Sequence, residues 1–211
     1  MRQAQVVVLA KEPVPGRVKT RLCPPLTPEQ AARVADAALQ DTLSAVRRCG
    51  AAHAMLAVDG AVNAPGLVVV DQHRGGLDAR IVGAFADAWA LHRLPTLLIG
   101  MDTPQLTPDL LDDALSRLLS PGIGAVLGLA LDGGWWALGL RKPDPALVLG
   151  IPTSRDDTGA LQRQRLIAAG LRVDDLGVLR DVDTVEDLEP VARAAPDRRF
   201  AAVVAQVLVT A

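Results

Sequence analysis

Four basic side chains gather in one short segment near the start of the chain. This segment, residues 10–22, reads AKEPVPGRVKTRL and continues from the apolar run QVVVLA. It holds two of the chain's three lysines, although arginine is the usual base elsewhere. Lysine supplies a compact point charge, and both basic groups form strong charge-assisted bonds to phosphate. We therefore predict a polyphosphate site here, with a solvated basic loop as the alternative. The four bases are Lys11, Arg17, Lys19 and Arg21.

The same segment has the backbone of a ligand-binding loop. Gly16 lets the chain approach a ligand closely, and Pro13 and Pro15 stiffen the path to it. GRVKT resembles part of a Walker A loop, but the first glycine and the contiguous Gly-Lys pair are missing. No GxGxxG follows the first apolar run, which argues against a dinucleotide-binding dehydrogenase.

Carboxylates that suit a divalent metal follow two other segments. Asp102 closes the run TLLIGMD, and Asp181 and Asp183 stand in RDVDTVEDL. Mg²⁺ usually takes one or two protein carboxylates together with substrate phosphates and water. Alternation along an extended chain puts Asp181 and Asp183 on one side, with Val182 on the other. The alternatives are a turn before proline at Asp102 and a favourable helix-dipole charge at Asp183.

A further acidic turn carries two of the chain's three tryptophans. Asp132, Gly133 and Gly134 separate two apolar runs, and Trp135 and Trp136 follow at once. Asp-Gly is a strong signal for a hairpin turn. Paired indoles beside an acidic turn also fit the wall of an acceptor pocket, and we favour this function slightly over a plain turn.

Short apolar runs and helical patterns alternate along the chain, which favours an α/β fold with a mostly parallel sheet covered on both sides. In such sheets ligands bind beyond the carboxyl ends of the strands, where the basic segment and the candidate carboxylates all fall. We expect strands at 5–10, 52–59, 66–72, 96–102, 125–131 and 135–140, and helices at 27–50, 78–93, 107–121, 158–170 and from 184, with the tail 200–211 as either.

The composition limits the classes of function. The 211 residues fit one domain, 1–211, and half are apolar, with few aromatics. A net charge of −2 argues against general nucleic-acid binding. No window reaches the length of a membrane span, and the first apolar run is too short for a signal peptide. Cys23 and Cys49 lack metal spacing, so a cytoplasmic protein with reduced thiols is the simplest expectation. A homodimer through the tail is an alternative to its packing on the chain's own sheet.

Four segments in order, AKEPVPGRVKTRL, GMDTP, LDGGWWALGL and DVDTVEDL, resemble a family of bacterial glycosyltransferase-like proteins with the GT-A fold. That family belongs to the nucleotide-diphospho-sugar transferase superfamily and is related to molybdenum-cofactor nucleotidyltransferases and phospholactate guanylyltransferases. The resemblance runs from about Val6 to Leu188. GGLDAR, residues 75–80, also resembles the family's Gly-Asp-Leu-Gly-Glu-Arg segment, although Gly76 and Ala79 replace acids.

The resemblance implies a three-layer α/β/α, Rossmann-like domain with a mixed, mostly parallel sheet, and it assigns roles to the candidate residues. Asp102 and Asp183 would bind Mg²⁺ or Mn²⁺, Asp132 would sit by the acceptor, and Arg80 would match the family's arginine. Gly133, Gly134 and Trp135 would border the acceptor pocket. The basic segment would hold the nucleotide phosphates through Lys11, Arg17, Lys19 and Arg21 around Gly16.

Three functions remain open from the sequence. The first is a Mg²⁺-dependent glycosyltransferase that takes a nucleotide sugar, with Lys19, Asp102 and Asp132 as the catalytic residues. The second is a nucleotidyltransferase that moves a nucleoside monophosphate from a triphosphate to a phosphorylated small molecule, which needs alignment and charge neutralisation but no base. The third is a nucleotide-binding module without turnover, because Trp135 and Trp136 replace tyrosines and IPTSRDDT lacks a tryptophan usual in the family.

Overall fold

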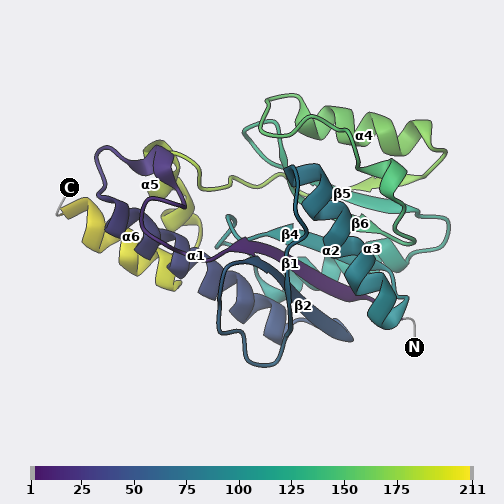
Figure 1. The fold of residues 1–211 in the computed structure, drawn as a ribbon, viewed down its shortest axis with the longest axis horizontal. Coiled ribbons are helices and arrows are strands. Elements are labelled where there is room, and N and C mark those ends of the chain that lie inside the picture. The colour runs from purple at the N-terminus through teal and green to yellow at the C-terminus, as the bar shows by residue number, and fades with distance from the viewer. Residues whose placement is uncertain (1–2, 210–211) are drawn as a thin grey trace.

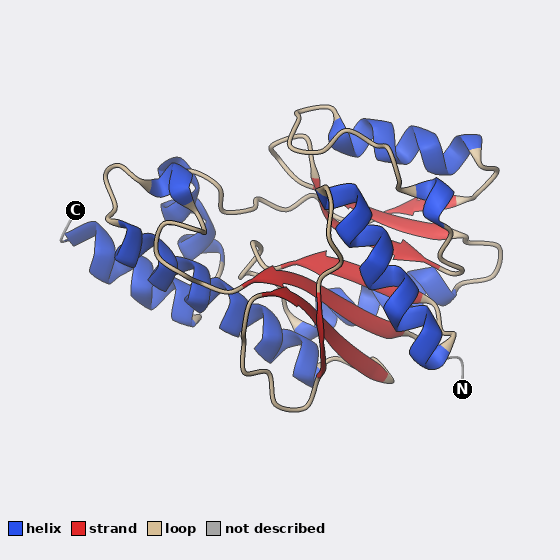
Figure 2. Cartoon of the chain, in the orientation of Figure 1, coloured by secondary structure: helices blue, strands red, loops and turns tan. Residues whose placement is uncertain are grey.

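The computed structural model describes residues 3–209, which form a seven-stranded sheet covered by helices (Figures 1 and 2). The strand order is β3-β2-β1-β4-β6-β5-β7. Among the strands formed by residues 3–209, only β6 runs antiparallel to its neighbours. The expected three-layer α/β/α architecture with a mostly parallel, mixed sheet is therefore confirmed. The strands are β1 (Gln5–Lys11), β2 (His53–Asp59), β3 (Val68–Asp71), β4 (Thr96–Gly100), β5 (Ala125–Leu129), β6 (Trp135–Leu140) and β7 (Val173–Asp175).

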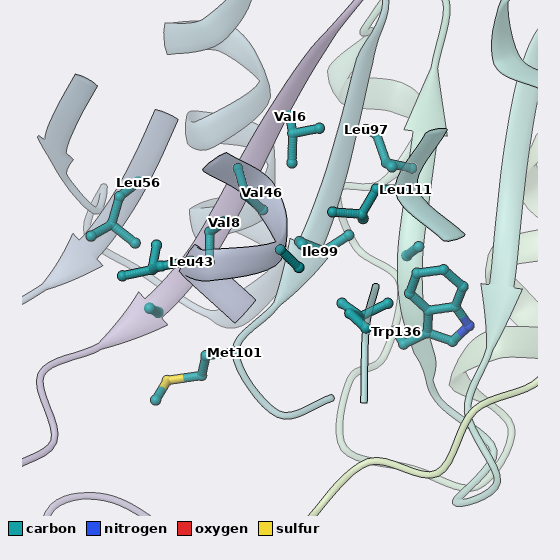
Figure 3. Close-up of a cluster of buried hydrophobic side chains, with 14 of the residues drawn as sticks. Val6, Val8, Leu43, Val46, Leu56, Leu97, Ile99, Met101, Leu111 and Trp136 are labelled. Atoms are coloured by element: carbon teal, nitrogen blue, oxygen red, sulfur yellow. The ribbon is translucent and has the colours of Figure 1, made fainter. Parts of the chain in front are cut away.

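Each face of the sheet packs against its own helices. Figure 3 shows the first face, where Val6 and Val8 of β1 meet Leu43 and Val46 of α1 in a buried cluster. On the other face, Val7 of β1 belongs to a separate buried cluster with α2 and α4. The helices are α1 (Pro28–Arg48), α2 (Leu77–His92), α3 (Pro108–Leu119), α4 (Thr158–Ala168), α5 (Val185–Ala194) and α6 (Arg199–Val209), with short 3₁₀ turns η1 (Thr20–Leu22) and η2 (Pro145–Leu147).

A third buried cluster lies beside the sheet and holds the two segments that carry the basic residues and Asp183. The first half of α1 extends past the sheet and packs with η1, α5 and α6 (Figure 1). Val182 is buried in this cluster together with Leu22 of η1. The basic segment and the chain around Asp183 are therefore held against the same helices, although about 160 residues separate them in the sequence. The tail forms helix α6 to Val209; its last two residues, 210–211, lie outside the described part.

Local capping chemistry starts the helices where the sequence places them. The Thr27 hydroxyl accepts a hydrogen bond from the Gln30 amide, and the Gln30 side chain accepts from Thr27 N–H at 2.7 Å. Pro28 occupies the first turn of α1. This reciprocal pair is the capping box expected from Thr-Pro-Glu-Gln. At the start of α5, the Asp187 carboxylate accepts from Thr184 N–H at 2.8 Å.

The site lies where the order in which strands are added to the sheet reverses. From β1 the chain adds β2 and β3 on one side, while β4 pairs with the other side of β1. The carboxyl ends of β1 and β4 therefore meet at a topological switch point, where open α/β sheets bind ligands. Lys11 is the last residue of β1, and Asp102 comes two residues after β4. None of the helices formed by residues 3–209 is long and apolar enough to cross a membrane.

Candidate active site

A cavity of about 780 Å³ opens at the carboxyl ends of β1 and β4. It brings together segments from the beginning, middle and end of the chain. Among the candidate binding and catalytic residues predicted from the sequence, Gly16, Gly133 and Trp136 do not line it. The predicted residues that line it are Lys11, Arg17, Lys19, Arg21, Arg80, Asp102, Asp132, Gly134, Trp135, Asp181 and Asp183.

The basic segment turns its charges into the cavity and its one acid away. Gly16 has φ +74°, a left-handed conformation that favours glycine, and no atom lies within 4 Å of the position of a Cβ there. Lys19 is also left-handed, with φ 48°, at the start of η1. Glu12 instead accepts a hydrogen bond from Ala61 N–H at 2.9 Å. The glutamate therefore stabilises a neighbouring loop and leaves the bases free of a competing carboxylate from their own segment.

Lys19 connects three parts of the chain. Its ammonium lies 2.7 Å from Asp102 Oδ1 and donates a hydrogen bond to the carbonyl of Val182. The backbone makes a parallel link, because Val182 N–H donates to the Asp102 carbonyl at 2.9 Å. The Lys19 side chain is only 11% exposed, against 39% for Asp102. The lysine therefore fixes the geometry between the end of β4 and the acidic segment 181–183.

The acidic segment 181–183 has the alternation expected from the sequence. Asp181 and Asp183 line the cavity, whereas Val182 points into the helical cluster. Asp183 forms an ion pair with Arg21. Burial raises the pKa of Asp181 to about 6, and the nearby Asp132 carboxylate adds to this rise. Lys19 opposes the rise in the Asp181 pKa, and Asp102 adds a smaller part to it. Acids from three segments thus share one electrostatic environment.

The carboxylates suit a divalent cation whose remaining coordination positions are filled by a bound ligand and by water. Asp102 Oδ1 is buried and has no hydrogen-bond partner among the described residues, since its contact with Lys19 is an ion pair without hydrogen-bond geometry. Within residues 3–209, no three histidine, cysteine or acidic side chains form a metal site by themselves. Mg²⁺ needs no such cage, because phosphates and water supply its other oxygen ligands. The donor set therefore suits an ion that arrives with a polyphosphate.

Arg80 is held in place by three oxygen atoms. One terminal guanidinium nitrogen lies 3.0 Å from Asp59 Oδ2 and 3.3 Å from Gln72 Oε1. The Nε atom donates to the Gly75 carbonyl at 3.2 Å. These contacts orient the guanidinium at the edge of the cavity. The second terminal nitrogen has no protein partner among these bonds, and it can serve a ligand.

The acidic turn after β5 is shaped by close packing. Asp132 Oδ1 accepts a hydrogen bond from Gly134 N–H at 2.8 Å, and Gly159 N–H donates to the Gly133 carbonyl at 2.8 Å. Gly133 has φ +87°, and a Cβ there would lie 1.8 Å from the Asp156 carbonyl oxygen. Gly133 therefore leaves room for the backbone of Asp156 and does not border the cavity itself.

The two tryptophans point in opposite directions. Trp135 lines the cavity, whereas Trp136 is buried and donates a hydrogen bond from Nε1 to the Gly177 carbonyl at 2.9 Å (Figure 3). The idea that both indoles form a pocket wall is therefore wrong. Successive residues of a strand face opposite sides, and this rule alone assigns only one of the two to the site.

A loop that sequence reasoning did not select forms another wall. Residues Thr153, Ser154, Arg155 and Asp156 all line the cavity. Ser154 has φ +60°, an uncommon conformation for a residue other than glycine. The only local signal was the cluster of polar residues in IPTSRDDT. Its position depends on the distant glycine turn at 133–134, which a single sequence does not reveal.

Replacing Gly133 by alanine is expected to destabilise the protein by about 2–5 kcal/mol. The left-handed backbone costs roughly 1–2 kcal/mol for alanine, and the clash with the Asp156 backbone adds roughly 1–3 kcal/mol. Gly170→Ala is the matched control, because Gly170 has φ +77° and nothing within 4 Å of its Cβ position. Urea unfolding measures both variants. Equal losses for the two would show that the 133–156 contact does not constrain the turn.

The free energy of unfolding of the metal-free protein, measured as a function of pH, should reveal the raised pKa of Asp181. Its folded pKa of about 6 exceeds the ordinary value of 3.8, so the folded state holds the proton more tightly. Stability contributed by this group is therefore present below about pH 4 and falls as the pH rises to about 6. Asp181→Asn should remove that fall and gain on the order of 2 kcal/mol at pH 7 relative to the parent. Asp197→Asn, on an exposed turn, should follow the parent, and an Asp181→Asn curve parallel to the parent would contradict the assignment.

Comparison with solved structures gives the same fold over nearly the whole chain. A "putative nucleotide-diphospho-sugar transferase" from Desulfovibrio desulfuricans is 26% identical, with a TM-score of 0.86, covering 98% of this chain and 99% of that one. CMP:2-keto-3-deoxy-manno-octonic acid synthetase, complexed with CTP, is 14% identical at a TM-score of 0.59 and covers 90% and 97%. Rv0371c from Mycobacterium tuberculosis, in complex with manganese, is 21% identical at a TM-score of 0.50 and covers 90% and 98%.

These likenesses confirm the expected resemblance to the nucleotide-diphospho-sugar transferase superfamily, whose fold is that of nucleotide-using transferases. No curated protein matches the sequence at a significant level. A family model described as "uncharacterized protein conserved in bacteria (DUF2064)" matches residues 30–155. That range is more than half of the chain and includes β4, Asp102 and the turn at Asp132. The chain therefore belongs to the DUF2064 family.

Proposed function

We propose that this protein is a divalent-metal-dependent transferase that takes a nucleotide-activated donor, and that the donor is a nucleotide sugar. The observation that carries the proposal is the convergence of the basic segment 11–21 with Asp102 in one cavity, with Lys19 Nζ 2.7 Å from Asp102 Oδ1. The similarity to the Desulfovibrio protein supports the donor class. The whole chain, 1–211, would act as one domain.

The bases of the segment are proposed to hold the phosphates of the donor. Lys11, Arg17 and Arg21 line the cavity from one side, and Arg80 adds an oriented guanidinium. Charge-assisted bonds from these groups favour a diphosphate that gains negative charge as it leaves. Arg80 is held in place before the ligand arrives by Asp59, Gln72 and Gly75, so this guanidinium needs little reorganisation during the reaction.

Asp102 and Asp183 are proposed to hold Mg²⁺ or Mn²⁺. Each carboxylate is now neutralised by a base of the segment, Asp102 by Lys19 and Asp183 by Arg21. When bound, the ion would neutralise charge on the leaving diphosphate as a Lewis acid. The two bases that it displaces would then be available to the phosphates. The manganese in the Rv0371c structure supports a divalent ion in this fold.

Asp132 is the proposed base for a hydroxyl acceptor. Its Oδ1 is fixed by Gly134 N–H, which leaves Oδ2 for the proton, and the residue lines the cavity next to Trp135. The neighbouring Gly134 has no side chain to obstruct an acceptor. Inverting glycosyl transfer needs such a base within hydrogen-bond reach of the attacking hydroxyl.

A nucleotidyltransferase is the second candidate, favoured by the shared fold of the CTP-complexed synthetase. In that reaction Lys19 and Arg17 would contact a triphosphate, and an anionic acceptor would need no base. Incubation with labelled nucleotide sugars and nucleoside triphosphates separates the two candidates. Sugar-dependent release of a nucleoside diphosphate supports glycosyl transfer, and pyrophosphate release supports nucleotidyl transfer. Nucleotide binding without either product would support a module without turnover. A cytoplasmic location and a homodimer remain predictions.

A further inference from the structure

The two sides of the cavity differ in charge. The basic segment follows β1, and Arg80 is held by Asp59 at the end of β2, so these bases enter the cavity from the β2–β1 side of the sheet. Lys19 and Arg21 reach furthest, to Asp102 after β4 and to Asp183. The turn with Asp132 joins β5 to β6, and the loop with Asp156 packs on that turn. In the sheet β6 and β5 lie beyond β4, on the opposite side from β2. Asp102, which follows β4, separates a basic half from an acidic half.

Among residues 3–209, the acidic half shows no cation without a carboxylate partner that could receive a phosphate. The cation of this half that lines the cavity is Arg155, and Asp157 neutralises it through two bonds. Arg155 Nε lies 2.8 Å from one carboxylate oxygen, and a terminal nitrogen lies 2.8 Å from the other. Such a bidentate pair engages the guanidinium through two parallel charge-assisted bonds, which occupies the arginine. The carboxylates of Asp132 and Asp156 therefore set the charge of this half.

An indole and hydroxyl groups complete the same wall. Trp135 borders the cavity at the end of the acidic turn, and Thr153 and Ser154 border it from the loop. An indole face offers an apolar surface with specific geometry, while carboxylates accept hydrogen bonds from hydroxyl or ammonium groups. Pockets that combine one apolar surface with a few convergent polar groups are typical of small-ligand sites. Two carboxylates beside an indole match the hydroxyl edge and the C–H face of a sugar ring.

We infer that the acceptor is a neutral or cationic polyol, such as a sugar or an amino sugar, and that the part which enters the acidic half carries no phosphate. This inference rests on the proposed function and makes it more specific. The hydroxyls of the polyol would bond to Asp132 and Asp156, and its ring would lie on Trp135. A phosphate in the same place would meet two carboxylates at short range, which disfavours it.

Binding measured by saturation-transfer NMR tests this inference. The protein is first saturated with Mg²⁺ and the nucleoside diphosphate that stabilises it most in a panel of UDP, GDP, CDP and ADP. Glucose, glucosamine and glucose 6-phosphate are then compared as probes of the acidic half. We expect binding in the order glucosamine, glucose and glucose 6-phosphate, from strongest to weakest. Stronger binding of glucose 6-phosphate than of both other probes would overturn the inference.

Three variants test which side chains of the acidic half bind the probes. Asp156→Asn and Trp135→Ala should each weaken glucosamine binding about tenfold or more without changing the nucleotide affinity. Asp157→Asn frees Arg155 and should strengthen glucose 6-phosphate binding, which a merely structural role for Asp157 would not do. Asp197→Asn is the control and should leave all three probes unchanged. Unchanged glucosamine binding in both Asp156→Asn and Trp135→Ala would overturn the inference, with circular dichroism verifying that each variant is folded.

This experiment separates the inference from the proposed function. Failure of every nucleoside diphosphate to bind with Mg²⁺ would contradict the proposed function before any acceptor is added. Nucleotide binding followed by a preference for the phosphorylated probe would leave the nucleotide site intact and overturn only the acceptor class. That second result would favour the nucleotidyltransferase.

Discussion

Asp102→Asn is expected to abolish the metal-dependent part of nucleotide binding and to lower turnover roughly 10³-fold. Asparagine keeps the size of the side chain but lacks the charge that a divalent ion requires. A bound metal contributes several kcal/mol to transition-state charge stabilisation, and each 1.36 kcal/mol is a factor of ten in rate. The measurement is nucleotide affinity by calorimetry, with and without Mg²⁺, and steady-state release of the diphosphate.

The control for this variant is Asp113→Asn. Asp113 is an exposed acid of α3, 3.7 Å from Arg117 and outside the cavity. It should retain the Mg²⁺ dependence and the turnover of the parent. If Asp102→Asn binds nucleotide with Mg²⁺ as tightly as the parent does, the assignment of Asp102 to the metal is wrong.

Lys19→Met is expected to have two opposite effects on ligand binding. It removes a charge that the phosphates should use, so nucleotide affinity in the presence of metal should fall roughly 10- to 10²-fold, the equivalent of the 1.5–3 kcal/mol of one charged hydrogen bond. It also removes the ammonium that neutralises Asp102 at 2.7 Å. Mn²⁺ affinity without nucleotide should therefore rise, because the ion no longer competes with a fixed positive charge.

The opposite changes in nucleotide affinity and in Mn²⁺ affinity distinguish this role of Lys19 from a loss of folding. A variant that simply unfolds the site would weaken both ligands. Lys142→Met is the control, since Lys142 is exposed and lies outside the cavity. Lys19→Arg should restore part of the nucleotide affinity, although the planar guanidinium does not reproduce a point charge. Lower Mn²⁺ affinity in Lys19→Met than in the parent would contradict the exchange of lysine for metal.

Much of the fold could be predicted because its signals are local. Thr27 with Gln30 and Thr107 with Pro108 fix the starts of two helices within four residues of chain, and the apolar runs mark the strands of the switch point. Local signals were weaker at the ends of elements. The run 125–131 forms a strand only as far as Leu129, and the register of that strand shifts between Gly128 and Leu129. The three-residue strand β7 is too short to show any periodicity and was not predicted.

The site was predictable in its members but not in their pairing. Residues after strand ends were expected to converge, and the cavity contains most of them. The pairing of Arg21 with Asp183 depends on the cluster that packs η1 against α5 and α6. The loop at 153–156 depends on a glycine far away, where the missing Cβ of Gly133 admits the Asp156 backbone. Such contacts arise from tertiary packing, which no short stretch of the sequence encodes by itself.

Titration of Mn²⁺ by electron paramagnetic resonance, with and without the nucleoside diphosphate that stabilises the protein most, tests the central claim most directly. If the bases and carboxylates bind a polyphosphate through a shared ion, one Mn²⁺ should bind tightly only when nucleotide is present. At 100 times the dissociation constant, the nucleotide with metal should also raise the melting temperature by about 5–10 °C. Nucleotide binding of equal affinity in EDTA, with no nucleotide-dependent uptake of Mn²⁺, would contradict the account.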